Sequence, residues 1–234
     1  MPNHVTSRLT VNGDPDEVKR LFASIENGKE KDGTPILIDF NKLIPMPESL
    51  NIESGSRGEN GLVLYMAKEH GDFKGVNEML ERPWAKKEGI TTFEQLYEYL
   101  VKKDPEILPL GRQYYENIQN YGCPTWYEWA NHYWGTKWNA YSQIRIDENT
   151  IEFQTAWDAV PGLMEVLSKK FPTLTLSYEY ADEDWGNNVG EYRFENGRCV
   201  DVNIPDYGSP EAERIAERLL GELYIEDESE DLEI

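Results

Sequence analysis

The hydrophobic positions near the start of the chain predict a strand, a helix and a second strand. Val5, Leu9 and Val11, with Ser7 between them, occupy every second position over residues 5–11, which is the pattern of a strand with one buried face. Asp14 and Pro15 then begin a predicted helix that Gly28 ends, because Asp caps the first turn and Pro fits the first helical position. A short apolar run over residues 36–40 predicts another strand. This order favours a sheet backed by helices.

The same order returns after Gly135. Residues 144–146 and 151–153 flank a polar turn and predict a hairpin, and a helical pattern follows over residues 161–170. Strict alternation over residues 174–180 predicts another strand, and Asn196-Gly197 predicts a tight hairpin turn before a last helix. The two ends of the chain therefore read as two β-α-β halves of one α+β fold.

The middle of the chain has helical spacing instead. Glycines at positions 55, 58 and 61, with serines between them, predict a flexible loop. Thr125 and Glu128 have the spacing of a capping box at the start of an aromatic helix. We predict one unit over residues 1–224, with 42–135 as a mostly helical insertion between the two halves. Residues 225–234 carry no basic residue, and we expect them to be a disordered acidic tail.

Charge narrows the classes of partner. The formal net charge of the 234 residues is −21, and a field of that sign repels phosphates and anionic lipids. We therefore expect no direct contact with nucleic acid and no membrane association. The favoured partners are basic proteins, cations, or a protein that itself binds nucleic acid.

Residues that carry chemistry are few. Cys123 and Cys199 are the two cysteines, a number typical of reduced thiols, and together with the absence of a long apolar run this favours the cytoplasm. None of the three histidines has metal-ligand spacing, although His132 and Glu128 could form a dyad instead of a surface pair. We predict no metal, no cofactor and no catalytic residue, and leave open whether the protein is an enzyme.

An aromatic block over residues 121–141 holds four of the seven tryptophans. Trp126, Trp129 and Tyr133 share one helical face, which favours a buried seam between the insertion and the sheet. The residues that follow leave this face and mix rings with polar groups, which is typical of recognition surfaces. For Asn139, a role in satisfying backbone groups of a turn stays open. The predicted binding surface is Trp134, Lys137, Trp138, Asn139 and Tyr141.

Three strings carry a resemblance to a known family. They are MPNHVT at residues 1–6, WGTKWNAY at 134–141 and FQTAW at 153–157. With them the chain resembles the YubB-type proteins of bacteriophages, plasmids and integrated elements, over most of its length. The resemblance implies a ferredoxin-like antiparallel sheet and a mobile-element setting. Those proteins have no established activity, so the resemblance assigns no catalytic residue.

Three hypotheses about function follow. The first is a non-enzymatic accessory protein of a phage, plasmid or integrated element that binds a host or element protein. The second is an acidic decoy that inhibits a host protein that binds DNA or RNA, which would need carboxylates arrayed on one face. The third is a small-molecule binder or enzyme with a pocket between insertion and sheet. The sequence leaves the partner and the oligomeric state open.

Overall fold

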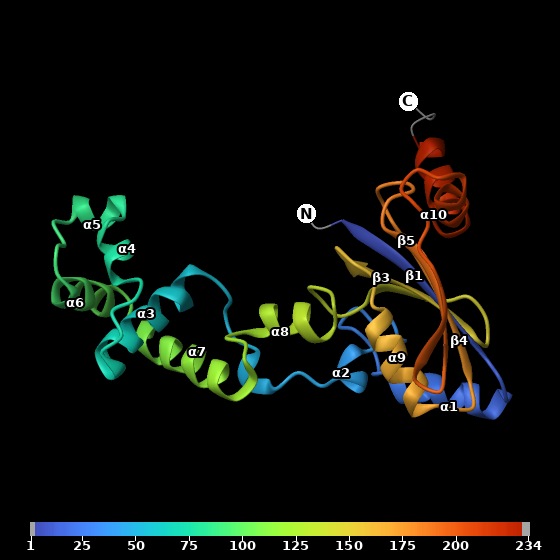
Figure 1. Cartoon of the computed structure of the whole chain (residues 1–234), viewed down its shortest axis with the longest axis horizontal. Coiled ribbons are helices and arrows are strands. Elements are labelled where there is room, and N and C mark those ends of the chain that lie inside the picture. The colour runs from blue at the N-terminus through green and yellow to red at the C-terminus, as the bar shows by residue number, and fades with distance from the viewer. Residues whose placement is uncertain (1–2, 231–234) are drawn as a thin grey trace. The chain divides into compact units, whose positions relative to one another are not determined.

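The computed structural model describes residues 3–230, with side chains up to Gly221, and divides the chain into two compact units (Figure 1). The sheet unit is formed by Met1–Pro45 and Ala130–Ile234. The helical unit is formed by Met46–Trp129. The boundary between them falls inside one helix, α8 (Trp126–Tyr133).

Within the described residues the sheet unit has one antiparallel sheet of six strands, in the order β2-β3-β1-β4-β5-β6. The strands β2-β3-β1-β4, joined through α1 and α9, have the β-α-β-β-α-β connectivity of a ferredoxin-like sheet. The predicted α+β class, with a ferredoxin-like antiparallel sheet backed by helices, is confirmed. The strands are β1 (His4–Asn12), β2 (Tyr141–Arg145), β3 (Thr150–Ala156), β4 (Thr175–Asp182), β5 (Val189–Glu195) and β6 (Arg198–Asn203); the helices are α1 (Pro15–Ile25), α2 (Phe40–Leu43), α9 (Pro161–Lys170) and α10 (Pro210–Glu230).

One face of the sheet holds the core. Val5, Ser7 and Leu9 alternate along β1 onto this face and are fully buried. The hydroxyl groups of Ser7 and Tyr178 share a hydrogen bond of 2.8 Å, and the backbone N–H of Val160, just before α9, donates to the same phenol at 3.0 Å. The polar groups that enter the core are therefore satisfied.

The opposite face carries α10 and a chain of charged side chains. Arg8 of β1 contacts Glu152 of β3 at 2.5 Å and Glu179 of β4 at 3.2 Å. Arg218 of α10 contacts the same Glu179 at 2.5 Å. Because both arginines share one carboxylate, the network ties α10 to the central strands. Next to it α10 packs its apolar side chains Ala212, Ile215, Ala216, Leu219 and Leu220 on Ala181 and Val189.

The expected strand at residues 36–40 is wrong. Asp39 is the N-cap residue of α2, so the chain turns into a short helix here. The side-chain carbonyl of Gln143 accepts hydrogen bonds from the N–H groups of Leu37 and Ile38 at 2.7 and 2.8 Å. A side chain, and not a neighbouring strand, satisfies this backbone. The second strand of the first half is therefore β2, and the helical segment interrupts that half between α1 and β2.

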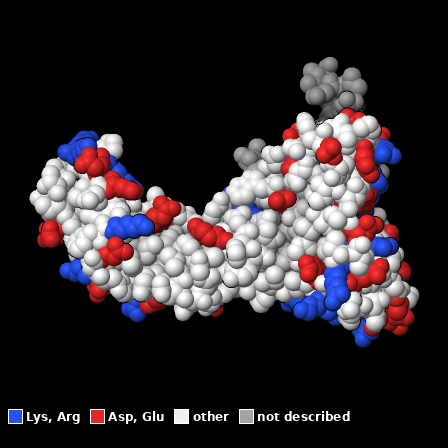
Figure 2. Space-filling model, viewed as in Figure 1, with Lys and Arg blue, Asp and Glu red and all other residues white. Residues whose placement is uncertain are grey.

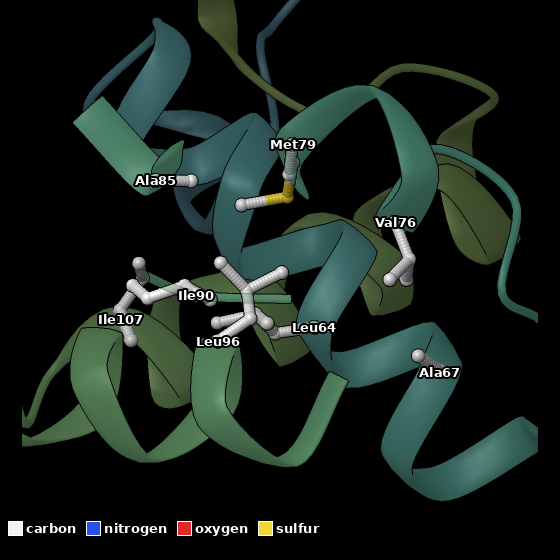
Figure 3. Packing of buried hydrophobic residues seen from close by; sticks show 8 residues of the cluster. All are labelled: Leu64, Ala67, Val76, Met79, Ala85, Ile90, Leu96 and Ile107. Atoms are coloured by element: carbon white, nitrogen blue, oxygen red, sulfur yellow. The ribbon is translucent and has the colours of Figure 1, made fainter. Parts of the chain in front are cut away.

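The helical unit has a core of its own. Its elements pack eight buried apolar side chains together, as Figure 3 shows: Leu64, Ala67, Val76, Met79, Ala85, Ile90, Leu96 and Ile107. The elements, besides the first part of α8, are the 3₁₀ helix η1 (Glu48–Leu50), α3 (Ser56–His70), α4 (Val76–Leu80), α5 (Pro83–Lys87), α6 (Phe93–Lys103) and α7 (Ile107–Tyr121).

Glycines set the contact between α3 and α7. Gly58 and Gly61, expected in a flexible loop, lie inside α3 and are buried, so that expectation is wrong for both. A Cβ atom at Gly61 would lie 2.3 Å from the carbonyl oxygen of Ile107, and one at Gly111 would lie 2.0 Å from the carbonyl oxygen of Gly61. The missing side chains let the two helix backbones touch, which is why a helix tolerates glycine here.

The domain boundaries predicted from sequence can be set beside these units. The helical unit, Met46–Trp129, lies within the insertion expected at 42–135. That the chain acts as one unit over residues 1–224 stays a prediction. The acidic segment expected to be disordered from residue 225 continues α10 to Glu230, because glutamate favours helix. Residues 231–234 of that segment lie outside the described residues.

Candidate binding surface

Trp134 belongs to the interior of the sheet unit. Its side chain is 6% exposed, and its indole N–H donates a hydrogen bond of 2.9 Å to the carbonyl oxygen of Ile44. Its ring meets the ring of Phe40 edge-on, with centroids 5.8 Å apart. The expectation that Trp134 faces solvent is therefore corrected, because the ring completes the core beside Phe40 and its one polar group is satisfied there.

Asn139 forms hydrogen bonds in the same region, around Phe40. Its amide nitrogen donates to the buried carboxylate of Asp39 at 2.7 Å. Its amide oxygen accepts from the backbone N–H groups of Phe40 and Ala140 at 2.9 and 3.0 Å. This is the structural role that the sequence left open for Asn139.

Lys137 and Trp138 do lie at the surface, together with a residue that was not predicted. The Lys137 ammonium is 4.6 Å from the centroid of the Trp138 ring and 4.9 Å from that of the Trp157 ring. Trp138 and Trp157 are 37% and 42% exposed, so both indoles meet solvent. Both distances are within the range of cation–π attraction. We call these three residues the tryptophan cage.

Trp157 is held in an unusual backbone conformation. Its φ of 75° lies in the left-handed region, which is a genuine outlier for a bulky side chain. The backbone N–H of Trp157 donates to the carbonyl oxygen of Asn3 at 2.9 Å, and the side chain of Asn188 donates to the Trp157 carbonyl at 3.3 Å. The surrounding loops thus impose the strain. Strain of this kind concentrates at sites where a side chain must be aimed.

Tyr141 supports the cage from β2. Its ring meets the Trp138 ring edge-on at 6.3 Å, and its hydroxyl donates to the carbonyl oxygen of Thr155 at 3.0 Å. The phenol has one proton, so the Nδ1–H of His4, 2.7 Å away, donates to the same oxygen. Burial, with a smaller contribution from the charge of Glu183, raises the pKa of Tyr141 to about 12. The phenol is therefore neutral and fixed at physiological pH.

Sequence reasoning missed Trp157 and His4. The register pairs His4 with Ala156 across β1 and β3, which brings the first residue of one strand beside the residue before Trp157. The sequence predicts the strands at 5–11 and 151–153, but it does not predict the register in which they pair. The string FQTAW was a signal for Trp157, since a large ring that directly follows a strand is placed at the end of the sheet.

The charged side chains on the face of the sheet that carries α10 form ion pairs with each other. A groove of about 590 Å³ there is lined by Arg8, Glu152, Ile144 and neighbouring residues. Within this groove Arg8 and Glu152 form the ion pair described above. The described residues contain no group of three or more His, Cys, Asp or Glu side chains placed to hold a metal ion.

No helix in the described part of the chain is both long enough and apolar enough to cross a membrane.

Comparisons with known proteins give a family match in the second segment of the sheet unit. Residues 133–231 match the family model described as a ferredoxin-like domain in Api92-like protein, and this range includes β2 to β6. This part of the chain is thus similar to the ferredoxin-like domain of Api92-like proteins. Among solved structures it is similar to protein api92 from Yersinia pseudotuberculosis, with 13% identity over 89% of this chain and 100% of that chain, at a TM-score of 0.38. A search of curated proteins finds no match.

Proposed function

We propose that this chain is a non-enzymatic accessory protein that binds another protein through the tryptophan cage and the rings beside it. The observation that carries the proposal is the pair of half-exposed indoles, Trp138 and Trp157, around one ammonium group. Tryptophan is among the residues that most often dominate binding energy at protein interfaces, because a single ring buries a large area and still offers an N–H donor.

Preorganisation supports a binding role. The backbone of Trp157 is held by hydrogen bonds on both its N–H and its carbonyl, and the Trp138 ring contacts Tyr141, which is itself held by two hydrogen bonds. Side chains that are already ordered lose little conformational entropy when a partner covers them. A rigid, exposed aromatic surface is therefore suited to recognition.

The mobile-element setting is part of this proposal. It rests on the resemblance to YubB-type proteins carried by the strings around Trp138 and Trp157. A phage or plasmid protein of this kind would act on a host protein or on another product of the same element.

The distribution of charge favours this function over an acidic decoy. A decoy needs rows of carboxylates at phosphate spacing without interruption by cations. On the face of the sheet unit seen in Figure 2, acidic and basic side chains are interspersed. On the face of the sheet that carries α10, Arg8 of β1 and Arg218 of α10 lie among the glutamates.

The test is quantitative capture. The tagged full-length protein and the double variant Trp138→Ala, Trp157→Ala are used to capture proteins from bacterial lysate. Bound proteins are then compared by mass spectrometry. The matched control is Ile146→Ala, which removes a 49% exposed apolar side chain that precedes β3, at the end opposite Trp157.

The proposal predicts one or a few proteins bound in near-stoichiometric amount by the wild type and by Ile146→Ala, and lost with the double variant. Circular dichroism checks that all three proteins fold. Equal capture of the same proteins by the double variant would overturn the proposal.

A further inference from the structure

The tryptophan cage already contains a cation. The ammonium of Lys137 lies close to the faces of two indoles, 4.6 and 4.9 Å from their centroids. Indole gives the strongest cation–π attraction of the natural side chains, and both lysine ammonium and arginine guanidinium groups are attracted to its face. The chemistry of the site thus matches a lysine side chain, and here the chain supplies that side chain itself.

Carboxylates surround this end of the sheet. Asp158 directly follows Trp157, and Glu183 and Asp184 follow the end of β4. The backbone N–H of Glu183 donates to the carbonyl oxygen of His4 at 2.9 Å, and the Glu183 charge acts on Tyr141, whose ring contacts Trp138. These acidic groups add a local negative field to the net charge of −21, and both draw a positively charged partner towards the cage.

We infer that the cage binds a lysine or arginine side chain from a basic segment of the partner protein, and that Lys137 is an internal occupant which the partner displaces. This inference rests on the proposed function and gives the chemical class of its partner. The two indoles would hold the incoming cation, and the neighbouring carboxylates would pair with flanking basic residues.

An internal occupant lowers the apparent affinity of the site. The partner binds only the fraction of molecules in which the Lys137 ammonium has left the cage, so the apparent dissociation constant equals the intrinsic one divided by that fraction. Removing the ammonium while keeping a side chain of similar length should therefore tighten binding of a basic ligand. A purely structural lysine would behave in the opposite way, since its loss would loosen the rings and weaken binding.

The experiment is a titration of the full-length protein with two synthetic peptides, followed by intrinsic tryptophan fluorescence at about 0.15 M salt to screen general attraction. One peptide is acetyl-Gly-Lys-Gly-Lys-Gly-amide, and the other has norleucine in place of both lysines. The proteins are wild type, Lys137→Gln and Trp157→Ala, with folding checked by circular dichroism.

The inference predicts that the lysine peptide binds the wild type weakly, binds Lys137→Gln about tenfold more tightly, and loses binding with Trp157→Ala. The norleucine peptide should not bind. Three results would each overturn it: equal or weaker binding by Lys137→Gln, equal binding of both peptides, or unchanged binding by Trp157→Ala, which would indicate general attraction to an acidic surface.

The two proposals fail separately. If capture from lysate depends on Trp138 and Trp157 but the lysine peptide behaves like the norleucine peptide, the chain binds a protein by other chemistry and only this inference falls. If the lysine peptide binds as predicted but the double variant captures the same proteins as the wild type, the cage is a cation site and the proposed function falls.

Discussion

The amide nitrogen of Asn139 donates a hydrogen bond of 2.7 Å to the carboxylate of Asp39, across 100 residues of sequence. Asp39 precedes the point at which the chain leaves the sheet unit, at Pro45, and Asn139 follows the point at which it returns, at Ala130. The hydrogen bond from Trp134 to Ile44 lies in the same region. These contacts hold the exit and the return of the chain together within the sheet unit.

We predict that Asn139→Ala lowers the free energy of unfolding of the sheet unit by about 2 kcal/mol. The change removes one of several hydrogen bonds to the buried Asp39 carboxylate and deprives the buried N–H of Phe40 of its acceptor, and an unsatisfied buried group costs about this much. Urea denaturation measures the change. Asn120→Ala removes an exposed amide and serves as the control. Equal stability of the two variants would show that the contact at Asn139 contributes little.

Gly111→Ala should destabilise the helical unit by about 3 kcal/mol, at the upper end for added methyl groups in packed regions. Its Cβ would lie 2.0 Å from the carbonyl oxygen of Gly61, and that backbone atom cannot move without separating α3 from α7.

The matched control for this prediction is Gly162→Ala in α9, where nothing lies within 4 Å of an added Cβ. That variant should be neutral or stabilise slightly, since alanine favours helix over glycine. Thermal unfolding followed by circular dichroism compares the two. A neutral Gly111→Ala would mean that the helices do not pack as closely as described.

Alkaline pH should weaken the sheet unit through its buried phenols. Burial raises the pKa of Tyr141 to about 12, and burial also raises the pKa of Tyr178 and of Tyr180. A phenol whose pKa is raised by folding stabilises the fold fully below the unfolded value, about 10, and this stability is lost as pH rises towards the folded value.

Tyr141→Phe should therefore lose less stability than the wild type between about pH 10 and pH 12. Urea denaturation at several pH values in that window measures the difference, and Tyr207→Phe, which changes an exposed ring, is the control. An identical pH dependence of wild type and Tyr141→Phe would contradict the assignment.

Trp157→Gly should change the free energy of unfolding by less than about 1 kcal/mol, although a tryptophan is lost. Glycine relieves the left-handed backbone at φ 75°, and relief of such strain contributes about as much as the half-exposed ring does. Trp185→Gly is the matched control, with a ring that is 38% exposed and no positive φ. It should be clearly destabilised, and equal losses in both variants would show that Trp157 is not strained.

The alternation of apolar residues was enough to find most of the sheet unit. The Asp14 cap, the helix at 161–170 and the Asn196-Gly197 turn are local signals, and the structure has Pro15–Ile25, Pro161–Lys170 and a hairpin between β5 and β6 at those places. The apolar run at 36–40 was wrongly predicted to be a strand. Its backbone N–H groups donate to the side chain of Gln143, more than 100 residues away, and not to a neighbouring strand. No local pattern encodes such a partner.

The candidate site was only partly predictable for the same reason. The sequence pointed to Lys137, Trp138 and Tyr141 through their mixture of rings and polar groups, and their role in binding stays a prediction. It could not separate buried Trp134 from exposed Trp138, because the difference depends on Phe40 and Ile44, which come from the other end of the chain. Gly61 and Gly111 show the same limit, since a glycine at a helix contact looks like a glycine in a loop.

The most direct test of the central claim is fluorine NMR of protein labelled with 5-fluorotryptophan, whose seven tryptophan signals are assigned by single substitutions. The lysine peptide described above, or a captured partner, is then added. Our account predicts shifts for Trp138 and Trp157, with the buried Trp129 and Trp134 unchanged. Shifts confined to other tryptophans, with Trp138 and Trp157 unmoved while the partner is bound, would contradict it.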